Sequence, residues 1–473
     1  MTAPVQAVGL PGRLADIAAS AEREAESRAA RFGWDPLTGL ALSASGPAAK
    51  DPRPLSVLAT KGGKSLFRYL EDERVQVFAA GQAPTSAPDL VATTSADPLA
   101  EARAGLELSD EVWRRLRSGE TKLAIDRSGE GEPHSAQHAA LLHGSLRAMG
   151  IAPSNCVYLT QDRSFRAAYL AHQSALGVSE PGMEVLVHDR FIQHLFASVR
   201  AAGDGGGEFR RRLQVYGTAG LARGRRFLSL NNKLVYAHRL FFLLRLLRDG
   251  LWNEGHISLG SLYEFDGRTV NRGQFLKRVH AMPELRGPLG ELLPLLDRLE
   301  AMSPRYLGVQ TPAPGGPSLK DLIFPSMFAE YADSWFSLVI ETDVSDRLHR
   351  ITEKPFKPLL SLHPFIVLGS CGSLRLIREF GFQTFGELFD ESYDQEPDMR
   401  TRLEMVYEQL VRLCRMDEDD LARACQAAAG AVVFNACWGL TQLPLLFRDR
   451  IDSALVDRLI WFVRGPATKG EPA

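Results

Sequence analysis

The chain has 473 residues, of which 45% are hydrophobic and 24% are charged. These values are typical of a globular protein with a sizeable core, and the length predicts two or three domains. The 55 basic and 57 acidic residues give a formal net charge of −2. This balance gives no global reason to expect a nucleic-acid or membrane-surface partner.

The five cysteines show neither a CxxC spacing nor a matching histidine pattern, so we expect reduced, mostly buried thiols and a cytoplasmic protein. No basic segment followed by an apolar one marks the N-terminus as a signal peptide. Residues 424–447 carry no charge, but polar residues and Pro444 interrupt them. We therefore expect a buried helix pair here, and no membrane span.

In chain order, residues 1–115 are rich in Ala, Pro and Gly and contain one clear helix, 14–32. We predict that they form an N-terminal extension or cap. An alternation of strands and helices then fills residues 116–220, which predicts a Rossmann-like domain with a parallel sheet covered on both faces. The expected strands are 121–126, 156–160 and 184–187, and the expected helices are 135–149 and 165–176.

Titratable side chains lie at the carboxyl ends of these expected strands, where α/β proteins bind ligands. They are Asp126, Glu130, Asp162, His188 and Asp189.

A second alternation predicts another Rossmann-like domain over residues 221–395, with an irregular insert near 256–325. Its expected strands are 226–230, 335–340 and 365–368, and its expected helices are 237–249, 352–360 and 373–380. Residues 396–473 are expected to be helical. The sequence therefore predicts a two-domain α/β protein with a helical N-terminal extension and a helical C-terminal segment.

One candidate site follows the expected strand that ends before Glu341. Thr352 is a reasonable N-cap, which places Glu353 and Lys354 in the first turn of a helix. Free N–H groups and a lysine at a helix N-terminus favour an anion such as phosphate, and a carboxylate can accept hydrogen bonds from a ribose. The alternative is that Thr352 only caps a surface helix.

A second candidate is Arg239, near the start of the expected helix that follows Asn231 and Asn232. A guanidinium pairs bidentately with phosphate oxygens and stays charged at any relevant pH. The alternative is an ion pair with an acidic neighbour on a surface helix.

These segments together resemble the nucleotide-binding region of the α1,3-fucosyltransferase family, which has the GT-B fold. In that family a strand ends in Glu-Asn, Thr-Glu-Lys opens a helix, and a Val-Pro-Val-type strand follows. An earlier Ser-Asn segment precedes an arginine that binds the donor diphosphate. The corresponding residues here are Glu341-Thr342, Thr352-Glu353-Lys354, Pro364-Phe-Ile-Val367, Ser229-Leu-Asn231 and Arg239. The match covers 226–369, and Thr342 replaces the family's asparagine.

The resemblance implies two Rossmann-like domains facing a cleft, with 116–220 as the acceptor domain and 221–395 as the nucleotide-sugar domain. It also implies inverting transfer of a hexosyl or deoxyhexosyl group from a GDP- or UDP-linked sugar to a glycan, a protein or a small acceptor. Arg239 and Lys354 would contact the diphosphate, and Glu353 would face the ribose. The remaining residues carried over are Glu341 near the donor sugar or ribose, and Asn231, Asn232 and Thr352 in the loops around the phosphates.

Glycosyl transfer also needs a base for the acceptor hydroxyl. Position alone favours Glu130 on the Gly-rich turn 128–131, with Asp126 as the second choice. The sequence shows no clear Asp-x-Asp motif and no metal-ligand spacing, so we expect a metal-independent enzyme with no cofactor beyond the nucleotide-sugar donor. Two alternatives remain: a non-catalytic nucleotide- or carbohydrate-binding protein, and a nucleic-acid-modifying glycosyltransferase, which the near-neutral charge disfavours.

Overall fold

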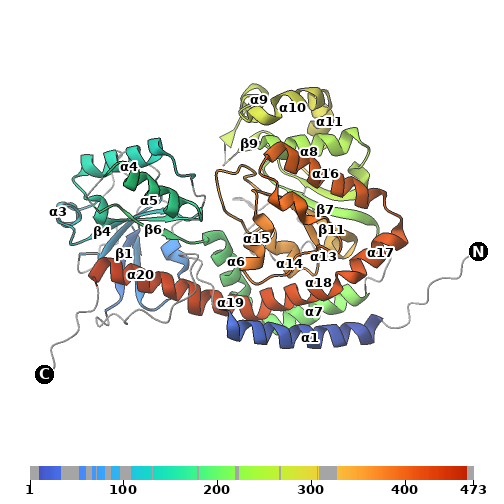
Figure 1. Cartoon of the computed structure of the whole chain (residues 1–473), viewed down its shortest axis with the longest axis horizontal. Helices are drawn as coiled ribbons and strands as arrows, with labels where there is room; N and C mark the ends of the chain where they lie inside the picture. The colour runs from blue at the N-terminus through green and yellow to red at the C-terminus, as the bar shows by residue number, and fades with distance from the viewer. Residues whose placement is uncertain are drawn as a thin grey trace, which may run out of the picture. The chain divides into compact units, whose positions relative to one another are not determined.

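The computed structural model describes residues 10–32, 53–59, 66–70, 72–79, 87–95, 108–129, 132–177, 181–218, 223–265, 268–305, 307 and 328–465. These residues form two compact units, each described by itself below (Figure 1). Unit 1 holds the described residues up to 31 together with 198–346 and 351–443, and unit 2 holds the others.

Unit 2 is built on a six-stranded parallel sheet with the strand order β2-β1-β3-β4-β5-β6. Its strands are β1 (Leu55–Ala59), β2 (Val75–Ala79), β3 (Leu90–Thr93), β4 (Lys122–Arg127), β5 (Cys156–Thr160) and β6 (Glu184–Val187). Its helices are η1 (Leu66–Tyr69), α3 (Asp110–Ser118), α4 (Ala136–Met149), η2 (Pro153–Asn155), α5 (Phe165–Ala175), most of α6 (Arg190–Ala201), most of α19 (Leu443–Leu446), η9 (Phe447–Asp452) and α20 (Ser453–Arg464).

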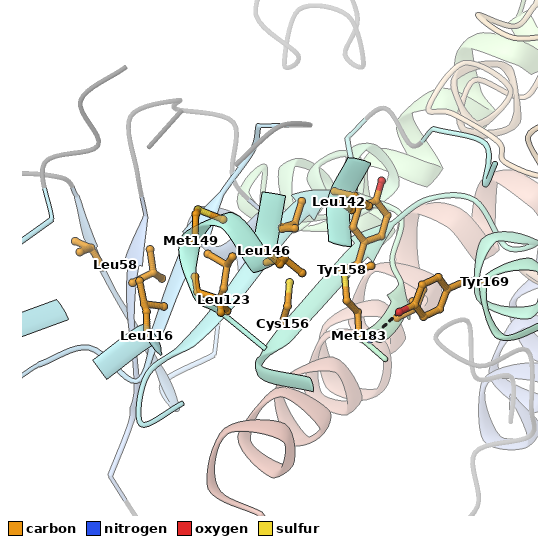
Figure 2. Packing of buried hydrophobic residues seen from close by; sticks show 14 of the residues in the cluster. Leu58, Leu116, Leu123, Leu142, Leu146, Met149, Cys156, Tyr158, Tyr169 and Met183 are labelled. Carbon is orange, nitrogen blue, oxygen red and sulfur yellow. Dashed lines mark hydrogen bonds between the residues drawn. The ribbon is translucent and has the colours of Figure 1, made fainter. Parts of the chain in front are cut away.

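Apolar side chains cover both faces of this sheet, which explains why its strands read as continuous apolar runs. Helices α3, α4 and α5 pack on one face, where Leu142, Leu146 and Met149 of α4 lie over Leu123 and Cys156 (Figure 2). On the other face, η1 and α20 contribute buried apolar residues, which are Leu66, Phe67, Leu455, Val456, Leu459 and Ile460. The C-terminal helix is thus part of the core of unit 2.

Unit 1 contains a four-stranded parallel sheet with the order β12-β11-β7-β8. These strands are β7 (Arg225–Asn231), β8 (Gly255–Leu259), β11 (Ser334–Ile340) and β12 (Phe365–Leu368). The chain leaves β7 toward β8 on one side and returns to β11 on the other side of β7. The boundary between β7 and β11 is therefore the topological switch point of the sheet, where ligands bind in open α/β folds.

The remaining elements of unit 1 are mostly helical. They are α1 (Leu10–Arg31), α7 (Gly205–Thr218), α8 (Ala237–Arg248), η3 (Trp252–Glu254), the β9–β10 hairpin (Glu264–Phe265 and Arg268–Thr269), α9 (Arg272–Val279), η4 (Pro283–Leu285), α10 (Arg286–Leu292), η5 (Leu293–Leu295), α11 (Leu296–Ala301), α13 (Phe328–Ala332), α14 (Phe356–Leu360), α15 (Ser373–Glu379), η7 (Glu391–Gln395), α16 (Met399–Arg415), α17 (Glu418–Ala427), α18 (Ala429–Cys437) and η8 (Trp438–Gln442).

The α/β class with two Rossmann-like domains is confirmed, whereas the cleft between them stays a prediction. Two predicted boundaries are wrong. Residues 1–115 are not only an extension, because β1, β2 and β3 form half of the sheet of unit 2. The insert near 256–325 is regular in its described part, which contains most of β8 and helices α9 to α11.

The helix expected at Thr352 begins only at Phe356, so Thr352 is not its N-cap and the five-residue α14 offers no long helix N-terminus to an anion. The cause is Pro355, since a residue that precedes proline is pushed out of the helical region and Lys354 is that residue.

The helical stretch Ala429–Arg464 is long and apolar enough to cross a membrane by composition alone. However, 67% of its most apolar 18-residue window is buried inside the protein, as in the core helix of a globular domain. All five cysteines are free thiols, and four of them are buried.

Candidate functional site

The candidate site of unit 1 lies at the switch point of its sheet, at the carboxyl ends of β7 and β11. The β7 strand ends at Asn231 and leads to Arg239 on α8, and β11 ends one residue before Glu341. The two segments that the sequence singled out therefore meet at one sheet edge.

Glu341 organises the loop that follows β11. Its Oε1 accepts a hydrogen bond from the Thr352 N–H (3.0 Å), and its Oε2 accepts from Thr352 Oγ1 (2.7 Å). The Thr342 N–H also donates to Oε2 (3.2 Å), and only 3% of Glu341 is exposed. Both carboxylate oxygens are thus used to close the loop between 342 and 352.

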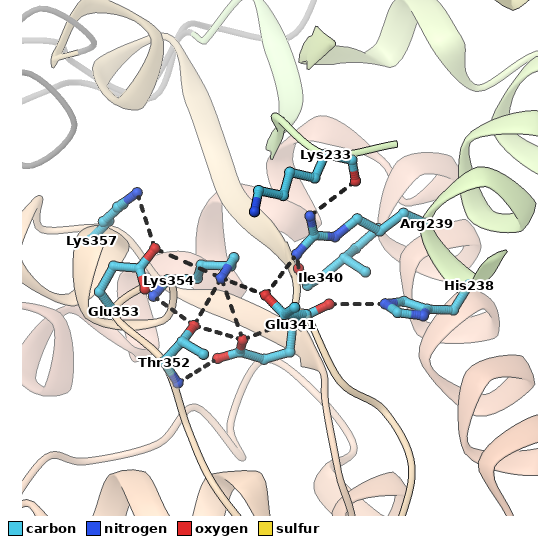
Figure 3. Close-up of polar contacts among 10 residues, drawn as sticks. Lys233, His238, Arg239, Ile340, Glu341, Thr352, Glu353, Lys354 and Lys357 are labelled. Carbon is cyan, nitrogen blue, oxygen red and sulfur yellow. Dashed lines mark hydrogen bonds and ion pairs between the residues drawn. The ribbon is translucent and has the colours of Figure 1, made fainter. Parts of the chain in front are cut away.

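Lys354 extends from this closed loop, and its ammonium group donates to Thr352 Oγ1 (3.0 Å; Figure 3). It also donates to Thr342 Oγ1 (2.9 Å). The carboxylates of Glu341 and Glu353 lie farther from it, at 3.8 and 3.7 Å. The side chain is 24% exposed. It is therefore held by neutral hydroxyls while its charge stays accessible.

Glu353 lies between two ammonium groups, because Lys357 Nζ is 3.8 Å from its Oε1. Burial would raise the pKa of this carboxyl, but the charges of Lys354 and Lys357 outweigh burial and lower the pKa to about 2. Glu353 is therefore ionised at neutral pH.

Arg239 is almost fully buried, with 2% exposure. Its guanidinium donates to the carbonyl oxygens of Lys233 (3.1 Å) and Ile340 (3.0 Å) and to Thr342 Oγ1 (3.4 Å), and it lies 5.1 Å from the ring centre of Tyr236. Among the described residues no carboxylate comes within 4.0 Å of it, and its Nε has no hydrogen-bond partner. Burial accordingly lowers the pKa of Arg239.

The two cations predicted to act together do converge in the structure, because Arg239 and Lys354 donate to the same oxygen, Thr342 Oγ1. Together with Lys357, Glu341 and Glu353, these two cations give the β7–β11 edge three positive and two negative charges. A buried charge without an ionic partner is costly, so an incoming anion would be stabilised here. The sequence did not single out Lys357, and it treated Thr342 only as a departure from the family pattern.

His238, next to Arg239, also belongs to this edge. Its Nε2 donates to the Glu341 carbonyl oxygen (2.9 Å). Burial, followed by the charge of Arg239, lowers the pKa of His238 to about 4. The ring is thus neutral at pH 7 and fixes the backbone of the residue that closes the loop.

Asn231 and Asn232 shape the turn after β7. Asn231 is fully buried, with its Nδ2 donating to Ser229 Oγ (3.0 Å) and its N–H to Ser258 Oγ (3.0 Å). Asn232 is exposed, and its carbonyl lies against Gly260, where a Cβ would come within 1.7 Å of the oxygen. Their position beneath a bound phosphate stays a prediction.

Arg402 of α16 links two loops at this edge, and nothing in the sequence pointed to it. Its Nε donates to the Gly369 carbonyl (3.0 Å) after β12, and its Nη2 donates to the Val344 carbonyl (2.6 Å) after β11. Nη1 donates to two further carbonyls, and Asp346 forms an ion pair with the guanidinium (3.1 Å). A fully satisfied buried guanidinium of this kind has a structural role.

The two predicted bases fall in unit 2. Glu130 lies outside the described residues. Asp126 follows the same pattern as Glu341, since its Oδ2 accepts from the Leu66 N–H (2.5 Å) and its Oδ1 from the N–H and hydroxyl of Ser128 (3.1 and 2.5 Å). Both oxygens therefore hold neighbouring backbone, which disfavours Asp126 as a proton acceptor.

No group of three or more His, Cys, Asp or Glu side chains that could hold a metal ion occurs within the described ranges. A pocket of about 200 Å³ lies between α4 and α5 in unit 2, and it includes none of the predicted site residues. Its lining includes Ala139, His143, Arg147, His172 and Gln173.

Comparisons with known proteins show no family for this chain. No protein-family model matches it, and no curated protein matches it. Among solved structures, the alpha,alpha-trehalose 6-phosphate synthase from Burkholderia multivorans is 12% identical, with a TM-score of 0.38 and coverage of 81% of this chain and 73% of that one. An alpha,alpha-trehalose-phosphate synthase (UDP-forming) from Burkholderia vietnamiensis is also 12% identical, with a TM-score of 0.37 and coverage of 79% and 72%. Likeness at this level transfers neither an activity nor a substrate to this chain.

Proposed function

We propose that the protein is a glycosyltransferase that binds the diphosphate of a GDP- or UDP-linked sugar between Arg239 and Lys354. The observation that carries the proposal is the convergence of both cations on Thr342 Oγ1 at the switch point of a parallel sheet. Switch points of open α/β sheets bind nucleotides, and the resemblance of 226–369 to α1,3-fucosyltransferases supports the same assignment.

The chemistry of glycosyl transfer fits this charge distribution. Negative charge grows on the nucleoside diphosphate as the bond to the sugar breaks, and fixed cations stabilise it in the transition state more than in the ground state. Arg239 needs little reorganisation for this role, because its guanidinium is already fixed by two carbonyls and a hydroxyl. The proposed reaction is an inverting single displacement without a metal ion.

The other residues of the edge take supporting roles in this proposal. Glu353 is ionised and faces the ribose hydroxyls, as the family resemblance implies. Glu341 acts by positioning instead, because both of its oxygens bind the loop that carries Lys354.

The proposal is tested by nucleotide binding to matched variants. Arg239→Ala and Lys354→Ala should each weaken donor binding by about 1.5–3 kcal/mol, or roughly 10- to 100-fold in Kd, because each removes a charged hydrogen bond to phosphate. The matched controls are Arg248→Ala at the exposed end of α8 and Lys277→Ala on α9, which should bind the donor as the unmodified protein does.

The ligand is first found by a thermal-shift panel of UDP, GDP, CMP and their sugar conjugates, since a ligand that binds only the folded state raises its Tm. Calorimetric titration with and without EDTA then measures the Kd and the need for a metal. Equal affinity of both site variants and both controls would rule out the assignment. Hydrolysis of the bound nucleotide sugar would distinguish an enzyme from a binding protein.

A further inference from the structure

The pocket of about 200 Å³ in unit 2 lies away from the strand ends at which α/β sheets usually bind ligands. Its walls come from the second halves of α4 and α5 and from the residues that lead into β5 and β6, which are Pro153 and Pro181–Gly182. The pocket therefore lies at the amino end of this sheet, and no residue from the carboxyl ends of the strands lines it.

The lining combines small apolar walls with a few polar side chains. The apolar part includes Ala139, Ala140, Pro153, Pro181 and Leu176, and Leu176 is 60% exposed. The polar part consists of His143, Arg147, His172 and Gln173. No Asp or Glu lines the pocket in the part of the chain that the structure describes. The described lining thus offers hydrogen-bond donors and positive charge without a compensating carboxylate.

The volume of the pocket suits a ligand with one ring. In other proteins an apolar cavity of roughly 150 Å³ holds a benzene molecule. A pocket of about 200 Å³ therefore has room for a six-membered ring with one small substituent. Ala139 and Ala140 contribute to this room, because a larger side chain at either position would fill part of the pocket.

Arg147 supplies the positive charge of the lining. It lies in the last turn of α4, is exposed, and forms no ion pair within the described residues. A cation at this position also interacts favourably with the helix dipole, so its place in the helix does not by itself indicate a ligand. The pocket beside it does, because a guanidinium next to an apolar cavity can bind a carboxylate through two parallel hydrogen bonds.

His143 adds a hydrogen-bond donor to the same wall. Its Nε2 lies 2.9 Å from the Tyr169 hydroxyl, which itself accepts from the Met183 N–H (2.8 Å; Figure 2). We therefore assign the hydroxyl hydrogen to His143 Nε2, which leaves Nδ1 as the N–H of a neutral ring. Burial, followed by the charges of Arg147 and His172, lowers the pKa of His143. The ring is thus neutral at pH 7 and donates a hydrogen bond.

The charge of the pocket selects among anions. Among the described lining residues only Arg147 carries a charge that is permanent at any relevant pH. A phosphate monoester brings about two negative charges at neutral pH, and the carbonyl groups at the C-terminal ends of α4 and α5 disfavour the second one. A carboxylate brings a single charge, which one guanidinium balances.

From this arrangement we infer that the pocket between α4 and α5 binds a small monocarboxylate whose apolar body is the size of one six-membered ring. The carboxylate pairs with Arg147 and accepts from the Gln173 amide and the His143 ring, while the apolar body packs against the alanine and proline walls. This inference goes beyond the proposed glycosyl transfer and does not rest on it.

The first experiment measures the binding of four probes to the full chain at pH 7 by NMR of the histidine rings. The signals of His143 and His172 are assigned from His143→Gln and His172→Gln. Benzoate should shift both signals and bind with a Kd of about 1 mM or lower. Acetate lacks the ring, benzyl alcohol lacks the charge and phenyl phosphate carries a second charge, so each should bind at least about tenfold more weakly.

Matched variants then locate the site. Arg147→Met should raise the Kd of benzoate roughly 10- to 100-fold, because a charged hydrogen bond is lost, whereas Arg166→Met on α5, outside the lining, should leave it unchanged. Ala140→Trp fills the pocket and should abolish binding, and Ala148→Trp on the same helix should not. Positions 140, 147 and 148 are exposed, so we expect these variants to fold, and their Tm without ligand checks this.

The pH dependence gives a further readout in the unmodified protein. The groups that act on His143 are Arg147 on its own helix and His172 and Tyr169 on α5. A carboxylate bound beside them should raise the pKa of His143, because a nearby negative charge favours the imidazolium. Benzoate should therefore bind more tightly at about pH 6 than at about pH 8.

Three results would overturn the inference. They are unchanged His143 and His172 signals with about 20 mM benzoate, equal affinity of Arg147→Met and Arg166→Met, and binding of acetate or benzyl alcohol as tight as that of benzoate. Tighter binding of phenyl phosphate would overturn the choice of a carboxylate. No nucleotide sugar enters these experiments, so their outcome and that of the proposed function are decided separately.

Discussion

The two units share a strand order but differ in the charges at their carboxyl edges. The order β8-β7-β11-β12 in unit 1 corresponds to β2-β1-β3-β4 in unit 2. In each sheet the second strand is added on one side of the first strand and the third strand on the other side, while all strands stay parallel. The described carboxyl ends of the strands in unit 1 hold three cations, Arg239, Lys354 and Lys357, and two carboxylates, Glu341 and Glu353, whereas those in unit 2 hold Asp126, Asp162 and Asp189 beside Arg127, Arg163 and Arg190. The strand order is thus shared, and the charges that follow the strands differ between the two sheets.

Within unit 1, two buried arginines show how a binding cation differs from a structural one. Arg239 and Arg402 are 2% and 1% exposed. Arg402 uses its Nε, Nη1 and Nη2 on loop carbonyls, whereas Arg239 leaves Nε without a partner among the described residues. Burial alone therefore does not distinguish a guanidinium that binds a ligand from one that supports the fold. The distinguishing feature is whether one of its N–H groups is left without a hydrogen-bond acceptor.

The largest expected effect comes from removing the structural arginine. Arg402→Met leaves the buried carbonyls of Gly369 and Val344 unpaired, so we expect the free energy of unfolding of unit 1 to fall by about 3–5 kcal/mol. Arg400→Met, at an exposed position on the same helix, should change it by less than about 0.5 kcal/mol.

Urea-induced unfolding, together with hydrogen exchange at the amides of β11 and β12, measures this difference. Equal stability of the two variants would show that the loops after β11 and β12 do not depend on Arg402. The distinction drawn between the two buried arginines would then be lost.

A smaller effect is expected from pH, because the cationic edge of unit 1 includes the buried, neutral His238. Its pKa is about 4 in the folded protein, against about 6.5 in an unfolded chain. The unfolded state therefore binds the proton more readily. The contribution of neutral His238 to the free energy of unfolding is complete above pH 6.5. It is lost as the pH falls toward 4, which lowers the free energy of unfolding by up to about 3 kcal/mol.

The measurement is the free energy of unfolding at several pH values between 7 and 4. His238→Gln keeps an N–H donor for the Glu341 carbonyl but cannot titrate, so its stability should fall less steeply than that of the unmodified protein. His280→Gln, at the end of α9, should leave the slope as it is. Identical slopes for all three proteins would mean that His238 is not buried as a neutral ring.

The sequence predicted the part of the fold in which strands and helices alternate at ordinary lengths. β5, β6 and β12 were predicted with their observed bounds, and β4, β7 and β11 to within one residue at each end. β1, β2, β3 and β8 were missed, although β5, β6 and β12 are equally short. β1 to β3 lie in a stretch rich in Ala, Pro and Gly, and β8 opens the stretch in which the alternation of strands and helices weakens. At Thr352, propensity favoured a helix start, and the local restriction before Pro355 overrode it.

The candidate site was predictable only where its residues follow strands. Arg239 and Lys354 could be paired because each follows a recognisable strand at the same end of the sheet. Arg402 reaches its partners through helix packing, which no local pattern encodes.

The smallest expected effect concerns the hydroxyl that both cations share. Thr342→Val keeps the shape of the side chain but removes the oxygen that accepts from Arg239 Nη2 and Lys354 Nζ. Both cations keep other partners, so we expect a loss of about 1 kcal/mol at most, or roughly fivefold in donor Kd, with Thr342→Ser close to the unmodified protein. Calorimetric titration with the donor found by the thermal-shift panel checks this. A loss larger than that of Arg239→Ala would instead place the Thr342 hydroxyl in direct contact with the ligand, because a group that only aligns two cations cannot contribute more than either of them.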